Sequence, residues 1–228
     1  MQCLTKFVLF VFLINKFNEA IVYECNPEYS CGCSSVTKIS VSARIVGGEA
    51  SENHAFGWMV SFQKNNVHLC GASLLTAEYA ITAAHCVDTI VDFSPYSILA
   101  GTYNLDDTGN PTVQRRVIQK AVIHPNYRAQ GFVNDIALIQ FAPLSTEPSS
   151  KISFICLPKS SEDIFKVNDS VIAIGWGVTR YNGGEIPKYL QQVSLKIFSS
   201  TSAECVRSSI SDASVQFCAA VYGGGKGK

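Results

Sequence analysis

The sequence predicts an all-β protein, and two observations lead to that class. Short apolar runs of strand length, rich in valine and isoleucine, recur with turn residues between them. These runs are Trp58–Gln63, Gly71–Thr76, Tyr96–Gly101, Val113–Ile123, Asp135–Phe141, Ser170–Trp176 and Leu190–Phe198. No segment has a sustained helical period, and only Thr201–Ile210 is compatible with one short helix. Many short strands joined by turns favour a β-sandwich or a β-barrel.

The first residues are typical of a secretory signal peptide. A lysine is followed by an unbroken apolar run, Phe7–Ile14, which is much shorter than the ~20 residues of a membrane span. We therefore expect a signal peptide at residues 1–20, a cysteine-rich leader at residues 21–44, and a secreted protein without a membrane span. A buried core segment at the N-terminus is the alternative interpretation.

Positive and negative charges are balanced, with Lys+Arg 18 against Asp+Glu 18. A chain without excess positive charge has no electrostatic attraction to nucleic acid or to an anionic membrane surface. We therefore expect no nucleic-acid partner, and a monomer is the default expectation for the oligomeric state.

The cysteine content predicts disulfide bonds. One cysteine, Cys3, lies in the expected signal peptide, and the others are an even number in an exported chain. They are Cys25, Cys31, Cys33, Cys70, Cys86, Cys156, Cys205 and Cys218. The sequence alone does not choose their pairing. A metal site in Cys25–Cys33 is disfavoured, because no second pair of ligands follows at a matching spacing.

Three short motifs follow one another along the chain: RIVGG at Arg44–Gly48, TAAHC at Thr82–Cys86 and NDIAL at Asn134–Leu138. Each motif alone is weak, since a lone histidine in an apolar run is usually a core residue. In this order and spacing the sequence resembles the trypsin/chymotrypsin-like serine proteases. The resemblance also includes His68–Cys86, His124–Tyr127, Ile155–Pro158, Gly175–Gly177 and Phe217–Ala220.

The resemblance implies a fold of two packed six-stranded antiparallel β-barrels, with the active site between them. The peptidase domain would occupy residues 45–228, with the first barrel at about 45–142 and a partial second barrel at about 152–228. The polar stretch Pro143–Lys151 would link them. The second barrel is expected to be incomplete in these residues, because the family's last strands and C-terminal helix correspond to positions after Lys228.

The resemblance also implies serine endopeptidase chemistry on a protein or peptide substrate. A serine hydroxyl is a weak nucleophile at neutral pH and needs a base poised near pH 7, which is the natural range of histidine. Following the triad long described for this family, His85 would be the general base and Asp135 the carboxylate that orients it.

The third member of the triad is missing from the 228 residues. No serine stands in a G-x-S-x-G or GDSGG-like setting, and Cys218–Lys228 resembles the glycine-rich turn that precedes the nucleophile in the family. We therefore expect this polypeptide to be an inactive fragment of a protease. The residues of the family's specificity pocket also correspond to positions after Lys228, so the sequence does not indicate which side chain is preferred at the cleaved bond. The alternative is a truncated, non-catalytic homologue that acts as a binding or decoy protein.

RIVGG implies a zymogen that is activated by cleavage between Arg44 and Ile45, through a protease with trypsin-like preference. In the family, the new amino group then pairs with an aspartate beside the nucleophile. The resemblance implies a propeptide that stays attached through a disulfide. The implied pairs are Cys70–Cys86, Cys205–Cys218, Cys33–Cys156 and, by remainder, Cys25–Cys31.

Two weaker signals concern modification and metal binding. The N-D-S sequon at Asn168 predicts glycosylation in an exported chain. The loop after Gly101 resembles a region where some family members bind calcium, but Thr102 stands near the place of a glutamate ligand. Asp106 and Asp107 are the carboxylates that remain nearby, and a hard cation needs several oxygen ligands. We predict no metal and no cofactor.

The other histidines and the two tryptophans have a structural interpretation. The resemblance places the histidines at positions that are structural in the family, and the tryptophans are expected in the core. These residues are His54, His68, His124, Trp58 and Trp176.

Overall fold

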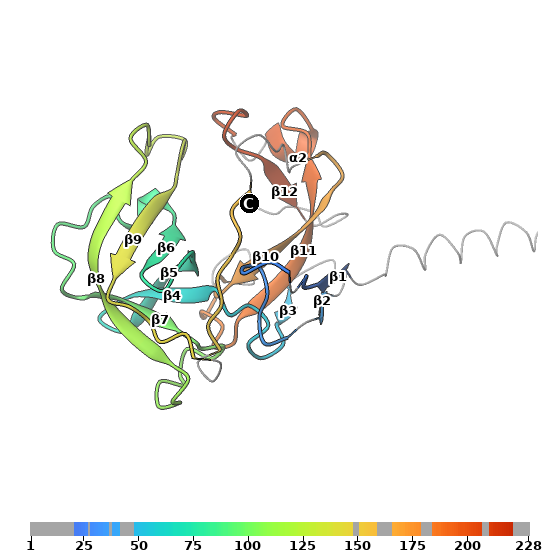
Figure 1. Cartoon of the computed structure of the whole chain (residues 1–228). Coiled ribbons are helices and arrows are strands. Elements are labelled where there is room, and N and C mark those ends of the chain that lie inside the picture. Colours follow the sequence, from blue (N-terminus) through green and yellow to red (C-terminus); the bar gives the residue numbers. More distant parts are fainter. Residues whose placement is uncertain are drawn as a thin grey trace, which may run out of the picture.

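The computed structural model describes residues 21–26, 28–36, 38–41, 48–147, 151–158, 166–178, 184–206 and 210–220. Three sequence predictions lie outside these residues: the signal peptide, the activation bond Arg44–Ile45 and the glycine-rich end at residues 221–228. The described chain is almost entirely β, in two halves that lie side by side (Figure 1). Within these ranges no helix is both long and apolar enough to cross a membrane.

The first half is a closed six-stranded barrel in which all neighbouring strands are antiparallel. Its strands follow the spatial order β4-β5-β6-β9-β8-β7, and β7 pairs back onto β4 (Figure 1). They are β4 (Met59–Lys64), β5 (Val67–Leu74), β6 (Tyr79–Thr82), β7 (Tyr96–Ala100), β8 (Gln114–Ile123) and β9 (Ala137–Phe141). Closure leaves this half without the unpaired strand edges that an open sheet exposes.

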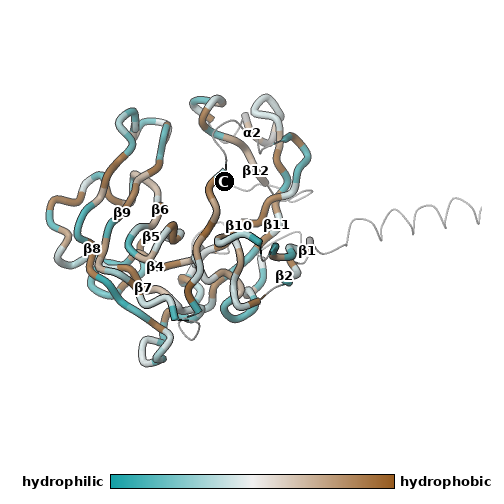
Figure 2. Tube along the Cα trace, viewed as in Figure 1, coloured by the Kyte–Doolittle hydropathy of each residue, from teal (hydrophilic) through white to brown (hydrophobic). Residues whose placement is uncertain are grey.

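The barrel closes because its strands alternate apolar side chains toward one interior. In β9, Ala137, Ile139 and Phe141 are buried, while the residues between them are partly exposed. Phe62 and Ile98 from neighbouring strands are fully buried in the same core. Figure 2 shows the apolar stretches along the tube of the barrel, with hydrophilic loops between them.

The described part of the second half is a four-stranded antiparallel sheet. In it, β11 (Gln191–Phe198) pairs with β10 (Ser170–Gly175), with β12 (Cys218–Ala220) and with β3 (Glu49–Ala50). The N-terminal strand β3 therefore joins the second half before the chain enters the first barrel. The predicted short helix is α2 (Ala203–Val206), and Trp58 and Trp176 are buried as predicted.

The leader packs onto the body of the protein as an ordered hairpin. Strand β1 (Ile21–Glu24) pairs with β2 (Lys38–Val41), and the burial of β2 alternates. Its inward residues, Ile39 and Val41, are buried in the same core cluster as the first barrel. The Ser34 hydroxyl donates to the Ala55 carbonyl at 2.8 Å, which adds a polar contact.

The disulfides of the leader correct the pairing implied by resemblance. Cys31, and not Cys33, is bonded to Cys156, and Cys33 is bonded to Cys25. Both pairs have ordinary Cα–Cα separations, 5.1 Å and 5.2 Å. The backbone explains the difference: Gly32 adopts φ +75° and donates its N–H to the Phe154 carbonyl at 2.7 Å, which places Cys31 beside Cys156. The pairs Cys70–Cys86 and Cys205–Cys218 are formed as expected.

Candidate active site

The pairing of β6 with β9 brings His85 and Asp135 to the same end of the first barrel. In this register Thr82 lies opposite Ala137. His85 follows β6 on the short 3₁₀ helix η1 (Ala84–Cys86), and Asp135 lies just before β9 begins. Two residues that are 50 positions apart in sequence therefore become neighbours through the antiparallel ladder.

The carboxylate of Asp135 holds His85 by two atoms at once. Its Oδ2 lies 2.7 Å from the imidazole Nδ1, and its Oδ1 accepts the backbone N–H of His85 at 2.9 Å. An ionised carboxylate can only accept hydrogen bonds, so Nδ1 must carry the proton of the neutral ring. The Nε2 lone pair is then left to accept a proton. The side chain of Asp135 is 19% exposed and that of His85 is 48% exposed, so the imidazole is accessible while the carboxylate is mostly covered.

Covalent and hydrogen-bonded constraints hold both ends of this pair. The disulfide Cys70–Cys86 ties η1 to β5 directly after His85. On the other side, Asn134 has φ +53°, and its side-chain amide donates to the Asn126 carbonyl at 3.0 Å. Each site residue is thus adjacent to a residue whose side chain is held by another segment, Cys86 after His85 and Asn134 before Asp135.

An aromatic side chain that the sequence reasoning missed lies beside the histidine. The ring centroid of Phe132 is 5.5 Å from that of His85, and the two planes cross at 74°. Phe132 is 55% exposed and has φ +50°, a conformation that is uncommon for a residue other than glycine. Its position three residues before Asp135 was the only signal in the sequence.

The other histidines have partners away from this pair. Nδ1 of His68 lies 2.7 Å from the Ser61 hydroxyl in the barrel, and its ring contacts Trp176 edge-on. Nδ1 of His124 accepts the backbone N–H of Asn126 at 3.2 Å. Their contacts agree with the structural interpretation of these residues.

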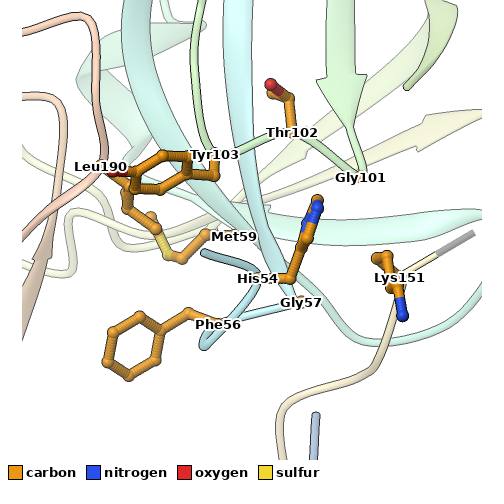
Figure 3. A pocket seen from close by; sticks show the side chains of 9 residues that line it. All are labelled: His54, Phe56, Gly57, Met59, Gly101, Thr102, Tyr103, Lys151 and Leu190. Carbon is orange, nitrogen blue, oxygen red and sulfur yellow. The ribbon is translucent and has the colours of Figure 1, made fainter. Parts of the chain in front are cut away.

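A small pocket lies beside His54, between the start of the first barrel and the loop after β7 (Figure 3). It is lined by His54, Phe56, Gly57, Met59, Gly101, Thr102, Tyr103, Lys151 and Leu190. Burial lowers the pKa of His54, the nearby charge of Lys151 lowers it further, and Asp107 partly opposes them. The lining includes neither His85 nor Asp135, so this pocket is separate from the candidate active site.

A family model described as Trypsin matches residues 45–228. The chain belongs to the trypsin family. Transmembrane protease serine 11B of Homo sapiens is 33% identical over 167 residues, which are 73% of this chain and 38% of that protein. Ovochymase-2 of Mus musculus is 31% identical over 187 residues, which are 79% of this chain and 30% of that protein. The chain thus spans only 30–38% of the length of these relatives.

A solved structure has the same fold. Human heparin binding protein is similar with a TM-score of 0.61 and 23% sequence identity, over 68% of this chain and 67% of that chain. At this identity the likeness shows the trypsin-like fold and nothing of the ligand.

The loop that binds calcium in some members of the trypsin family is held here by its own side chains. The Thr102 hydroxyl donates to the Asn104 carbonyl at 2.6 Å and accepts the backbone N–H of the same residue. Asp106 forms an ion pair with Lys188, and Asp107 accepts a hydrogen bond from the Asn110 amide. One oxygen atom of each of these side chains is thus engaged within the loop or with an ammonium group, whereas a hard cation would need several of them together.

Among the described residues, one group of metal-ligating side chains converges: Cys70, His85 and Cys86. Its two cysteines are bonded to each other, so they offer no thiolate to a metal ion.

We predict that His68 makes the folded state lose stability in mild acid. Burial lowers the pKa of His68 from its ordinary value of 6.5, so below that pH the unfolded chain binds a proton that the folded chain resists. The free energy of unfolding should therefore fall as pH drops below 6.5. Denaturant unfolding at a series of pH values measures this slope.

Two variants identify the source of that slope. His68→Gln should make the decline shallower than in the parent. Ser61→Ala should keep the decline, because burial and not the hydroxyl lowers the pKa. An unchanged slope in His68→Gln contradicts the assignment.

Proposed function

We propose that the protein is a serine endopeptidase of the trypsin family, with His85 as general base and acid and Asp135 as the orienting carboxylate. The observation that carries the proposal is the two-point contact between them, 2.7 Å at Nδ1 and 2.9 Å at the backbone N–H. This contact leaves Nε2 in the state that a general base needs. Membership of the family supports proteins or peptides as the substrate class.

In this mechanism the nucleophile is a serine hydroxyl from a segment outside the 228 residues. As its oxygen attacks the carbonyl carbon of the scissile bond, Nε2 of His85 accepts the hydroxyl proton. The imidazolium then gives that proton to the departing amine, and an acyl-enzyme remains. Water attacks the acyl-enzyme in the same way, with His85 again accepting and returning the proton. Asp135 stays ionised and stabilises the imidazolium throughout.

The coding sequence that follows Lys228 tests this function most directly. We expect it to continue in frame into an Asp-Ser-Gly-Gly stretch. The longer product, cut after Arg44, should hydrolyse peptide amides, and a serine-directed phosphonate should inhibit it. The 228-residue polypeptide alone should neither hydrolyse peptide amides nor react with the phosphonate.

Matched histidine variants test the role of the base. His85→Ala should lower kcat of the longer product by orders of magnitude, and His54→Asn, in the separate pocket, should leave it nearly unchanged. A stop codon directly after Lys228 would instead favour the non-catalytic binding protein, and turnover by His85→Ala at the parent rate would contradict the assigned base.

We further propose that the protein is a secreted zymogen. Residues 1–20 would be the signal peptide, residues 21–44 the leader and residues 45–228 the peptidase domain. Asn168 would carry the glycan: it is exposed in the turn before β10, and its backbone N–H donates to the Ile197 carbonyl at 2.8 Å. The disulfide Cys31–Cys156 would keep the leader attached after cleavage at Arg44.

Cleavage with trypsin should convert the secreted chain into two disulfide-linked pieces, one of which begins at Ile45. N-terminal sequencing and denaturing gels without reductant measure this. Arg44→Gln should remain uncut at this bond.

Cysteine variants test the tether. Cys31→Ser should release the leader on the non-reducing gel, whereas Cys33→Ser should retain it, because Cys33 is bonded within the leader. The opposite pattern, release by Cys33→Ser and retention by Cys31→Ser, would refute the tether described above.

A further inference from the structure

The loop before β12 in the second half contacts the loop before β9 in the first barrel, next to His85. In Figure 1 the two loops face each other at the upper end of the view. Within this contact, the side-chain amide of Gln216 bonds to both loops. Its Nε2 donates to the Gly131 carbonyl at 2.9 Å and to the Phe132 carbonyl at 3.1 Å.

The other end of the same amide binds its own loop. Oε1 of Gln216 accepts the backbone N–H groups of Ser211 and Asp212, both at 2.9 Å. Gln216 thus makes two donor bonds across to the first barrel and two acceptor bonds within the second half. Glutamine suits this place because its two ends are a double donor and a double acceptor.

Gly131 shows how closely the two loops approach. It has φ +81°, and a Cβ atom added there would lie 2.1 Å from the Ser211 hydroxyl oxygen and 2.6 Å from the Ser211 Cβ. No side chain fits between the loops at this point, and the left-handed backbone also favours glycine.

Two charged residues, Asp212 and Arg128, lie at the edge of the contact between the two loops. The pKa of Asp212 is lowered, first by hydrogen bonds from Ser214 and further by the nearby positive charge of Arg128 on the first-barrel loop. The ionised form of Asp212 is therefore favoured where the two loops meet.

Phe132 needs such support. It is a bulky residue with φ +50°, and backbone in this region persists where the surroundings determine it strongly. Part of that support is local, since Arg128 and Val133 exchange backbone hydrogen bonds at 2.9 Å and 3.1 Å. Phe132 also donates its own N–H to the Ala129 carbonyl at 3.3 Å. Support from the other half of the protein comes from Gln216, which binds the carbonyl groups on both sides of the Phe132 nitrogen and Cα.

We propose that Gln216 is a positioning residue of the active site: it holds the backbone of Gly131 and Phe132 so that the Phe132 ring stays against His85. The ring contact limits the movement of the imidazole away from Asp135. A residue of the second half of the protein thereby controls the surroundings of His85 in the first barrel. This inference rests on the proposed function, because a positioning role matters only if His85 is the base. Its test measures ring contacts and needs no peptide hydrolysis.

The test is NMR spectroscopy of the full 228-residue chain, labelled so that the ring resonances of His85 and Phe132 are resolved. Gln216→Glu keeps the two acceptor bonds to Ser211 and Asp212 but removes the donors to the first-barrel loop. We expect it to weaken the nuclear Overhauser effects between the two rings at least twofold. The His85 ring resonances should move toward their positions in Phe132→Ala.

The matched control is Gln114→Glu, since both ends of the Gln114 amide also bridge two segments. Gln114 is the first residue of β8, whereas the last, Ile123, lies opposite Ala137 near the site. It should leave the His85 resonances in place at a similar unfolding midpoint. Gln216→Asn, which is one methylene shorter, gives a second test that does not add charge. Unchanged ring contacts in the folded Gln216 variants, or equal changes in Gln114→Glu, would overturn the proposal.

Discussion

The antiparallel pairing of β6 with β9 is the constraint on which the rest of the site depends. It places the segment after Thr82 and the segment before Ala137 at one end of a closed barrel. Because a closed barrel has no free edge, this register cannot slip without exposing the apolar set of β9 to water. The disulfide Cys70–Cys86 then fixes the turn that carries His85. The geometry of the His85–Asp135 pair thus depends on the whole barrel.

Much of the fold could be predicted from the sequence, because the alternation of apolar and polar residues along a strand indicates which face is buried. Each of the seven predicted runs overlaps a strand, although β4 and β5 extend beyond theirs, and the family resemblance supplied the barrel. The leader was harder: β2 was missed because its apolar pattern rests on two residues, Ile39 and Val41. The pairing of Cys31 with Cys156 depends on the left-handed backbone of Gly32. This conformation cannot be inferred from the amino-acid composition or from the spacing of the cysteines.

The candidate site divides in the same way. His85 and Asp135 stand in motifs of the family, so they could be named before any geometry was known. Phe132 and Gln216 could not, since their roles arise from a contact between two loops 84 residues apart in sequence. An aromatic residue in a loop and a glutamine before a cysteine are ordinary in isolation. What joins them is the packing of the two halves, and this packing is a long-range property of the chain.

We propose that Asp135 sets which nitrogen of the neutral His85 ring carries the proton, and ¹⁵N NMR of the histidine side chains measures this directly. The geometry predicts that the neutral ring carries its proton on Nδ1 and leaves Nε2 bare. In Asp135→Asn this preference should be lost, because the new amide can donate to Nδ1. A parent ring protonated on Nε2, or a tautomer that does not change in Asp135→Asn, would contradict the account.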